Sequence, residues 1–319
     1  MANPTRRTVL ALLPAALAAP SVLRAASPVQ TLTGDAFGAR WRVSLPDGAR
    51  AGGLRARIAA LLAQVDAQMS PWRADSEIGR LNASAEVRRP VSVHTAQVSA
   101  AALRIAAQSG GHFDPTVGPL VARWGFGPIT GATRPHGWQA VSVQGDEITR
   151  DAPLTLDLCG IAKGHALDRV AALLAADYGD FLIDVGGELT ARGRHPSGRG
   201  WQIAVEDPRG PGVAEVLALD GRAVATSGDG VNVHVTGGRR LSHIIDPDAG
   251  APVAGPLASV SVVAGDAMTA DGWATALFAA GTKAGPALAQ ARGIAALFLW
   301  RDATPRRMTG GFERYLARA

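Results

Sequence analysis

The sequence predicts an α+β fold, with mostly antiparallel sheets flanked by helices. Three observations favour this class: several short strands follow one another without helices between them, a few long helices stand beside them, and no stretch repeats at a solenoid period. The 319 residues, 47% of them hydrophobic, suffice for a sizeable core in one large domain or two intertwined lobes. A doubly wound α/β fold with a parallel sheet is the alternative.

The first 26 residues are typical of a cleaved export signal. A twin arginine at residues 6–7 precedes an apolar run that two prolines interrupt and that ends at small residues around 25–26. The run is shorter than the roughly 20 residues of a membrane span. We therefore expect a twin-arginine signal peptide at 1–26, a single domain at 27–319 and a periplasmic location. No cysteine lies at the signal's end, so a lipoprotein is not expected.

Alternation and helical spacing predict the elements of the mature chain in order. Residues 39–45 alternate as a strand does, and apolar residues at helical spacing predict a helix over 54–69. A second helix over 95–111 ends at two glycines, as helix C-termini commonly do. The later elements are predicted as strands at 153–158, 181–187, 201–208, 221–228, 258–265 and 294–300, and as helices at 159–176 and 267–281.

Composition excludes several classes of protein. Cys159 is the single cysteine, so the chain forms no internal disulfide. The net charge of +5 comes from scattered basic residues that are not interleaved with aromatic ones, which argues against a nucleic-acid partner. No P-loop, H-E-x-x-H helix or G-x-S-x-G elbow is present, so the common hydrolase and NTPase mechanisms are disfavoured.

The helix over 267–281 carries two oxygen side chains one turn apart. Asp271 and Thr275 are at i and i+4, so a carboxylate and a hydroxyl on one face could share a cation. In the alternative interpretation, Asp271 caps the helix start and Thr275 bonds a carbonyl of the preceding turn. This stretch alone leaves both interpretations open.

Four further polar clusters end strands or open helices. Asp114 and Thr116 lie in a loop where ordinary turn chemistry is the alternative. Lys163 near a helix start opposes the helix dipole and therefore needs an anion or a carboxylate nearby. The other two clusters are D-V-G-G-E at 184–188, which could be a tight turn, and S-H-I-I-D-P-D at 242–248, whose histidine could be structural. Taken together, this oxygen-rich set favours a hard cation such as magnesium over zinc.

Seven ordered blocks resemble the FAD:protein FMN transferase family, also called the ApbE family. The resemblance covers about residues 31–300. The blocks are MSPWRADSEIGRLN, GHFDPTVGPLVARWGFGP, LDLCGIAKGHALDRV, FLIDVGGELTARG, AVATSGD, SHIIDPDAGAPV and DAMTADGWATALFAAG. The resemblance implies two intertwined lobes around a central FAD cleft. It also implies an enzyme that uses Mg²⁺ to transfer FMN from FAD to a threonine hydroxyl of an acceptor protein, with release of AMP.

The resemblance also implies the site residues. It assigns the metal to Asp271, Thr275 and the backbone carbonyl of Gly160, and catalytic roles to Asp271 and to His243 as a base. The residues that it places against FAD are Phe37, Trp72, His112, Phe113, Asp114, Asp157, Lys163, Ile244 and Ile245. The acceptor would be an exported or membrane redox subunit with a threonine flavinylation motif.

Three positions depart from the family's pattern. Phe37 and Ala39 stand where the family usually has the methionine and threonine of M-G-T, so a polar contact to the flavin is in doubt. Cys159 stands where glycine or serine is more usual, and its thiol is not expected to bind magnesium, which prefers oxygen. Two alternatives stay open: an FAD pyrophosphatase that yields FMN and AMP, an activity that the resemblance also implies, and a non-catalytic flavin-binding protein, which the residues at positions 37 and 39 suggest.

Overall fold

An eight-stranded antiparallel sheet forms the centre of the molecule. The computed structural model describes residues 29–151, 153–230, 233–236 and 239–318, so the predicted signal peptide lies outside the described residues. The strands, in spatial order, are β1 (Val29–Ala36), β2 (Ala39–Pro46), β6 (Phe181–Val185), β7 (Glu188–Arg192), β10 (Arg222–Gly228), β15 (Leu257–Ala264), β16 (Ala295–Trp300) and β17 (Arg307–Thr309). Every pairing between neighbours in this sheet is antiparallel. The predicted α+β class is confirmed, and the doubly wound alternative is wrong.

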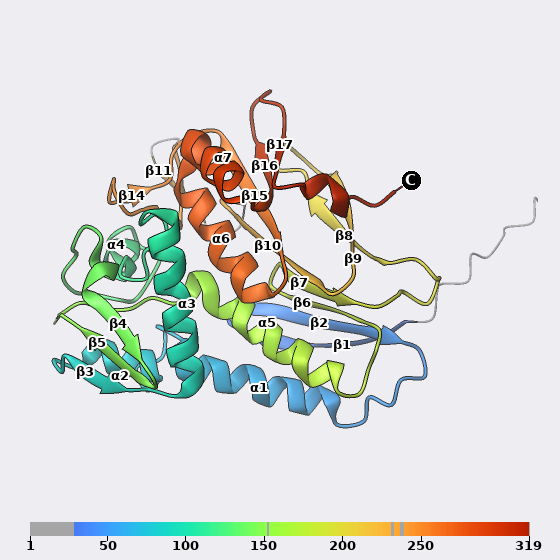
Figure 1. Cartoon of the computed structure of the whole chain (residues 1–319), viewed down its shortest axis with the longest axis horizontal. Coiled ribbons are helices and arrows are strands. Elements are labelled where there is room, and N and C mark those ends of the chain that lie inside the picture. The colour runs from blue at the N-terminus through green and yellow to red at the C-terminus, as the bar shows by residue number, and fades with distance from the viewer. Residues whose placement is uncertain (1–28, 152, 231–232, 237–238, 319) are drawn as a thin grey trace, which may run out of the picture.

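Helices cover one face of this sheet and a hairpin covers the other (Figure 1). The helices are α1 (Leu54–Met69), α5 (Cys159–Ala175) and α6 (Ala267–Ala279). The hairpin consists of β8 (Trp201–Glu206) and β9 (Val213–Leu219). In β16, Phe298 and Trp300 pack in the helix-side core while Leu297 and Leu299 pack in the hairpin-side core. A strand buried on both faces has no polar positions, which explains its continuous apolar run.

Smaller elements surround this centre. One group forms a three-stranded sheet beside two helices, at the left of Figure 1. It comprises β3 (Arg88–Pro90), β4 (Val141–Gln144), β5 (Glu147–Arg150), α2 (Glu77–Ala83) and α3 (Val93–Ser109). The other elements are α4 (Gly118–Arg123), η1 (Gly137–Ala140), β11 (Val233–Thr236), β12 (Arg239–Ser242), β13 (Ile245–Asp246), β14 (Ala251–Pro252), α7 (Gly281–Arg292) and η2 (Phe312–Tyr315).

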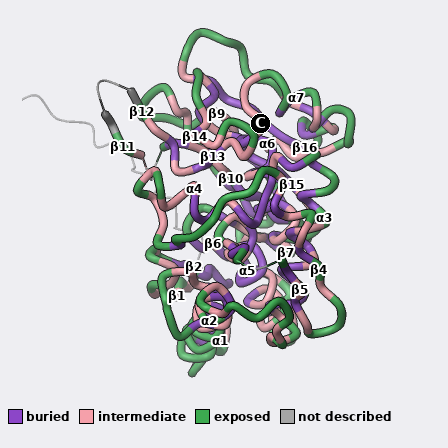
Figure 2. Tube along the Cα trace, turned by 90° about the vertical axis from the view of Figure 1, so that its left-hand side faces the viewer, coloured by how far each residue is buried: buried purple, intermediate pink, exposed green. Residues whose placement is uncertain are grey.

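The buried residues follow the predicted apolar positions, and Figure 2 shows where buried residues lie along the chain. In α1, Leu54, Ile58, Leu62, Val65 and Met69 are buried, as their helical spacing indicates. None of the helices in the described part of the chain combines the length and the apolar run that crossing a bilayer requires.

The predicted strand over 153–158 does not form among its described residues. The backbone of Leu156 instead pairs with the side chain of Asn82, at 2.8 Å for both its N–H and its carbonyl. The next amide, that of Asp157, donates to the Pro115 carbonyl at 2.7 Å. Because a side chain and a loop satisfy these groups, the segment is extended without a partner strand.

Candidate functional site

The predicted site residues all line one cleft of about 1770 Å³. This volume exceeds the usual range for small-molecule pockets, so a large ligand can be accommodated. The predicted residues on its wall are Phe37, Trp72, His112, Phe113, Asp114, Asp157, Gly160, Lys163, His243, Ile244, Ile245, Asp271 and Thr275. Their convergence is a structural finding, while the role of each remains a prediction.

Oxygen atoms from three elements meet at one corner of this cleft. The Thr275 hydroxyl on α6 lies 3.4 Å from the Gly160 carbonyl in the first turn of α5. The hydroxyl of Ser227, near the end of β10, lies 3.2 Å from the Thr275 hydroxyl. Asp271 is one helical turn before Thr275 and is buried. A donor set of hydroxyl, carbonyl and carboxylate oxygens is of the kind that a hard cation prefers.

Asp271 does not cap its own helix, which was the alternative suggested by the sequence. Asp266 is the N-cap of α6, and its carboxylate accepts from the Thr269 amide at 2.7 Å. Asp271 instead accepts from the Gly164 amide on α5 at 2.9 Å. Burial raises the pKa of Asp271, and the positive charge of Lys163 and the Gly164 amide oppose this rise.

Glu188 is the carboxylate that Lys163 needs. The Lys163 ammonium lies 2.6 Å from Glu188 Oε1, and Glu188 is buried at the start of β7. Burial lowers the pKa of Lys163, but the charges of Glu188 and Asp271 outweigh it and raise the pKa overall. For Glu188, burial outweighs Lys163 and raises the pKa to about 8. The sequence flagged Glu188 only as part of a possible tight turn, because the partner of Lys163 is 25 positions away.

Cys159 opens α5 beside this corner. Its amide donates to the Asp157 carboxylate at 2.9 Å, which places Asp157 at the entry of the helix. The Cys159 side chain is accessible from the cleft. Desolvation by the surrounding protein atoms and the charge of Asp157 nevertheless raise the pKa of its thiol well above the ordinary value. A neutral thiol is a poor metal ligand, so the oxygen character of the corner is preserved.

Phe113 and Asp114, two of the residues predicted to contact FAD, are already engaged in contacts within the protein. Phe113 is buried, and its ring packs so close to Gly160 that a side chain at that glycine would lie 3.2 Å from Phe113 Cε2. Asp114 accepts from both the amide and the hydroxyl of Thr116, at 2.8 and 2.6 Å. The turn chemistry expected of this loop is therefore present, and burial raises the pKa of Asp114.

Aromatic side chains also line this cleft. Phe37 occupies the turn between β1 and β2 with a positive φ of 55°, which is uncommon for a bulky residue. Trp72 is 68% exposed at the rim. His243 lies with its ring 6.4 Å from the Phe126 ring in an edge-on arrangement. These flat surfaces suit the stacking of aromatic ring systems.

Sequence reasoning missed a charged group elsewhere on the cleft wall. Arg301 forms an ion pair with the buried Asp229, and Arg240 donates to the Asp229 carbonyl at 2.7 Å. Two guanidinium groups beside one carboxylate leave excess positive charge, which favours an anionic ligand. Asp229 follows β10, Arg240 lies in β12 and Arg301 follows β16, so their proximity left no local pattern in the sequence.

The described residues contain no cluster of three or more His, Cys, Asp or Glu side chains that could hold a metal. Soft-metal and zinc centres of the usual kind are therefore not found in that part of the chain. The predicted magnesium set does not depend on such a cluster, since it combines one carboxylate with a hydroxyl and a main-chain carbonyl.

A scan against protein families matches residues 37–298 to the ApbE family. The chain belongs to the ApbE family. Solved structures of ApbE proteins have the same fold: the flavin transferase ApbE from Vibrio cholerae superimposes with a TM-score of 0.81 at 32% identity, covering 91% of this chain and 100% of that one. The apo Pseudomonas stutzeri flavinyl transferase ApbE gives 0.81 at 35% identity, with 91% and 98% covered.

Two curated relatives of this ApbE-family chain have the same name. The FAD:protein FMN transferase of Klebsiella pneumoniae (strain 342) is 35% identical over 303 residues, covering 87% of each chain. The enzyme of the same name from Salmonella typhimurium (strain LT2) is 34% identical, covering 89% of this chain and 88% of its own. The predicted family is confirmed, and so is the prediction of a transferase.

Proposed function

We propose that this chain is a magnesium-dependent FAD:protein FMN transferase that attaches FMN to a threonine hydroxyl of an acceptor protein and releases AMP. The observation that carries the proposal is the meeting of an oxygen-rich corner and an aromatic wall in one large cleft. FAD has a diphosphate that a cation can bind and two ring systems that aromatic side chains can stack on. The names of the relatives support the same substrate.

The residues at the corner fit a magnesium ion. Gly160 would supply a carbonyl oxygen, Thr275 a hydroxyl and Asp271 a carboxylate. Asp271 and Glu188 are two buried carboxylates beside the Lys163 ammonium, and burial raises the pKa of both, so a bound cation would favour their ionised forms. When bound, magnesium supplies Lewis-acid polarisation of the diphosphate and charge neutralisation.

The proposed reaction exchanges one phosphorus–oxygen bond for another. The threonine hydroxyl oxygen attacks the phosphorus of the FMN half, the bond from that phosphorus to the bridging oxygen breaks, and AMP leaves with the bridging oxygen. His243 accepts the hydroxyl proton, and Lys163 places a positive charge beside the diphosphate. Such chemistry depends mainly on positioning and electrostatics, which a rigid cleft provides.

We further propose that the acceptor is an exported or membrane redox subunit with a threonine flavinylation motif, and that the enzyme acts in the periplasm. The twin arginine at 6–7 and the small residues at 25–26 support a signal peptide at 1–26, followed by one domain over 27–319. An acceptor outside the cytoplasm would follow from that location.

Replacing Asp271 by Ala tests the function directly. The mature chain is incubated with FAD, Mg²⁺ and an acceptor domain that contains the threonine motif, and the acceptor mass is measured. Because the corner loses the Asp271 carboxylate, we expect transfer to fall by at least about 10²-fold. Asp151→Ala, which removes an exposed carboxylate paired with Arg134, is the matched control and should transfer at the wild-type rate.

Three other outcomes would contradict the proposal in different ways. Near wild-type transfer by Asp271→Ala would refute the metal assignment. Magnesium-dependent AMP release from the wild-type chain, without an adduct on any of several acceptors, would identify an FAD pyrophosphatase. Tight FAD binding without AMP release would identify a non-catalytic flavin-binding protein.

A further inference from the structure

Three contacts join α5 to α6, each one helical turn from the next. The Thr275 hydroxyl meets the Gly160 carbonyl, and the Asp271 carboxylate accepts from the Gly164 amide. One turn further along α5, Asp168 meets the first residues of α6. Successive contacts move forward along α5 and backward along α6, so the two helices run antiparallel through this interface near the centre of Figure 1.

Asp168 belongs to α5 but caps the N-terminus of α6, and it thereby joins the two helices. Its two carboxylate oxygens accept from the Ala267 amide at 2.7 Å and from the Met268 amide at 2.9 Å. The first amides of a helix have no partner within it, and they attract a negative charge. Because both oxygens are engaged, rotation or sliding of α6 against α5 would break a charge-assisted hydrogen bond.

The two helices approach each other so closely that few alternative registers of α6 on α5 are possible. A side chain at Gly164 would come within 2.3 Å of the Ala267 carbonyl, so the backbones meet here with no room for a Cβ atom. Burial also disfavours the charged form of Asp168 and raises its pKa to about 6. The hydrogen bonds from the two α6 amides oppose this rise.

We propose that Asp168 is a positioning residue for the metal corner, which it serves by fixing the register of α6 on α5. The Gly160 carbonyl belongs to α5, whereas Asp271 and Thr275 belong to α6, so their spacing depends on this register. Asp168 itself contacts neither the corner nor the cleft wall. The inference rests on the proposed function, because it concerns the metal site assigned there.

Direct measurement of metal binding tests the proposal without relying on turnover. Mn²⁺ is titrated into the chain in the presence of FAD, and the dissociation constant is measured by electron paramagnetic resonance. We expect Asp168→Ala to weaken Mn²⁺ binding about tenfold or more, as loss of outer-shell support typically does. The KM for FAD should change by less than about twofold, because no predicted flavin contact is touched.

Asp266→Ala is the matched control. Asp266 caps the same end of α6 through the Thr269 amide, and among the described residues it makes no hydrogen bond to α5. We expect this variant to bind Mn²⁺ as the wild type does, even if its melting temperature falls as much as that of Asp168→Ala. Wild-type Mn²⁺ binding by Asp168→Ala, or equal weakening by Asp266→Ala, would overturn the proposal.

Two further variants keep the outcomes distinct. If Asp168→Ala does not fold, Asp168→Asn replaces it in the test. This variant keeps one acceptor oxygen, so we expect Mn²⁺ binding to be about threefold weaker than in the wild type. Wild-type Mn²⁺ affinity of Asp168→Asn would overturn the inference. Asp271→Ala should abolish binding at the corner. If it binds Mn²⁺ as the wild type does, the metal assignment of the proposed function is wrong, and the inference fails for that separate reason.

Discussion

Three buried carboxylates on or near α5 and α6 have raised pKa values but different partners. Burial raises the pKa of Asp168, Glu188 and Asp271. Glu188 and Asp271 share Lys163, while Asp168 has only two backbone amides. A buried acid without a cationic partner costs stability when it ionises, so Asp168 makes the stability of the protein depend on pH.

The pH dependence of Asp168 has a definite sign. Its pKa rises from 3.8 to about 6 on folding, so between these values the folded chain binds the proton more tightly than the unfolded chain. The contribution of Asp168 to the unfolding free energy is therefore present below about pH 4 and is lost as the pH rises through 6. Relative to Asp168→Asn, which does not titrate, we expect the wild type to lose roughly 2–3 kcal/mol between pH 4 and pH 7.

Urea unfolding of both proteins at several pH values measures this difference. The Asn variant serves as the reference, because all other titrating groups are common to the two chains and their contributions cancel. A difference that stays constant, or that favours the wild type increasingly as the pH rises, would contradict the burial account of Asp168.

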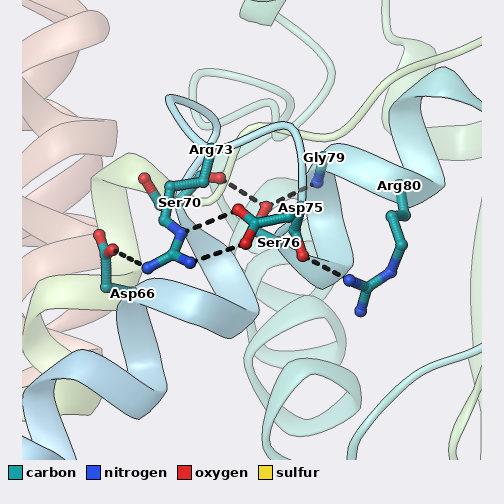
Figure 3. A network of polar contacts seen from close by, with 7 residues as sticks. All are labelled: Asp66, Ser70, Arg73, Asp75, Ser76, Gly79 and Arg80. Atoms are coloured by element: carbon teal, nitrogen blue, oxygen red, sulfur yellow. Dashed lines mark hydrogen bonds and ion pairs between the residues drawn. The ribbon is translucent and has the colours of Figure 1, made fainter.

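At the scale of elements, a network of polar contacts holds the turn between α1 and α2 (Figure 3). Arg73 donates to Asp75 and also to Asp66 on α1. Ser76 caps α2 through the Gly79 amide at 2.8 Å and donates to the Ser70 carbonyl at 2.7 Å. These contacts tie both ends of the turn that carries the exposed Trp72.

Arg73→Ala should therefore affect flavin binding more than folding. Exposed ion pairs contribute little to stability, so we expect a nearly unchanged urea midpoint. Trp72 would lose its fixed position, so FAD binding would have to order the turn. We therefore expect the dissociation constant for FAD to rise about three- to tenfold. Quenching of flavin fluorescence measures it.

Arg88→Ala is the control for Arg73→Ala, because Arg88 also forms an exposed ion pair, with Glu147 at 3.2 Å, but does not line the cleft. Equal FAD affinities for the two variants would show that the Arg73 network does not position Trp72.

At the scale of the whole molecule, strand order brings the site together. β2 pairs with β6 although they are far apart in the sequence, and β7 pairs with β10. The turn with Phe37, the start of β7 with Glu188 and the end of β10 with Ser227 thereby reach the cleft that α5 and α6 also line. Each block contributes one to three of the candidate residues, so no single segment contains a complete site.

The proposed export by the twin-arginine route can be tested on the full-length chain. Replacing both Arg6 and Arg7 by Lys keeps the charge but removes the paired guanidinium groups, which differ from ammonium groups in shape and hydrogen bonding. We expect the precursor to stay in the cytoplasm and the mature form to disappear from the periplasmic fraction. Cell fractionation and immunoblotting measure both, and an unchanged periplasmic mature form would refute the twin-arginine route.

The sequence by itself determined the fold class and most of the elements, and through the family resemblance it predicted which residues line the site. Local spacing encodes these features: the apolar positions of α1 repeat every turn, and Asp271 and Thr275 are i, i+4 neighbours on one helix. Even the short motif around Lys163 indicated the need for an anion, because the helix dipole is a local property.

Only the tertiary structure decided which residues are partners. Glu188 as the counter-ion of Lys163, Ser227 beside Thr275 and Asp168 at the start of α6 are all contacts between distant segments. The extended segment at 153–158 differs from its predicted strand because the Asn82 side chain, not a neighbouring strand, satisfies its backbone. Hydrogen bonds and charge pairs depend on distance in space, and periodicity along a chain does not contain that distance.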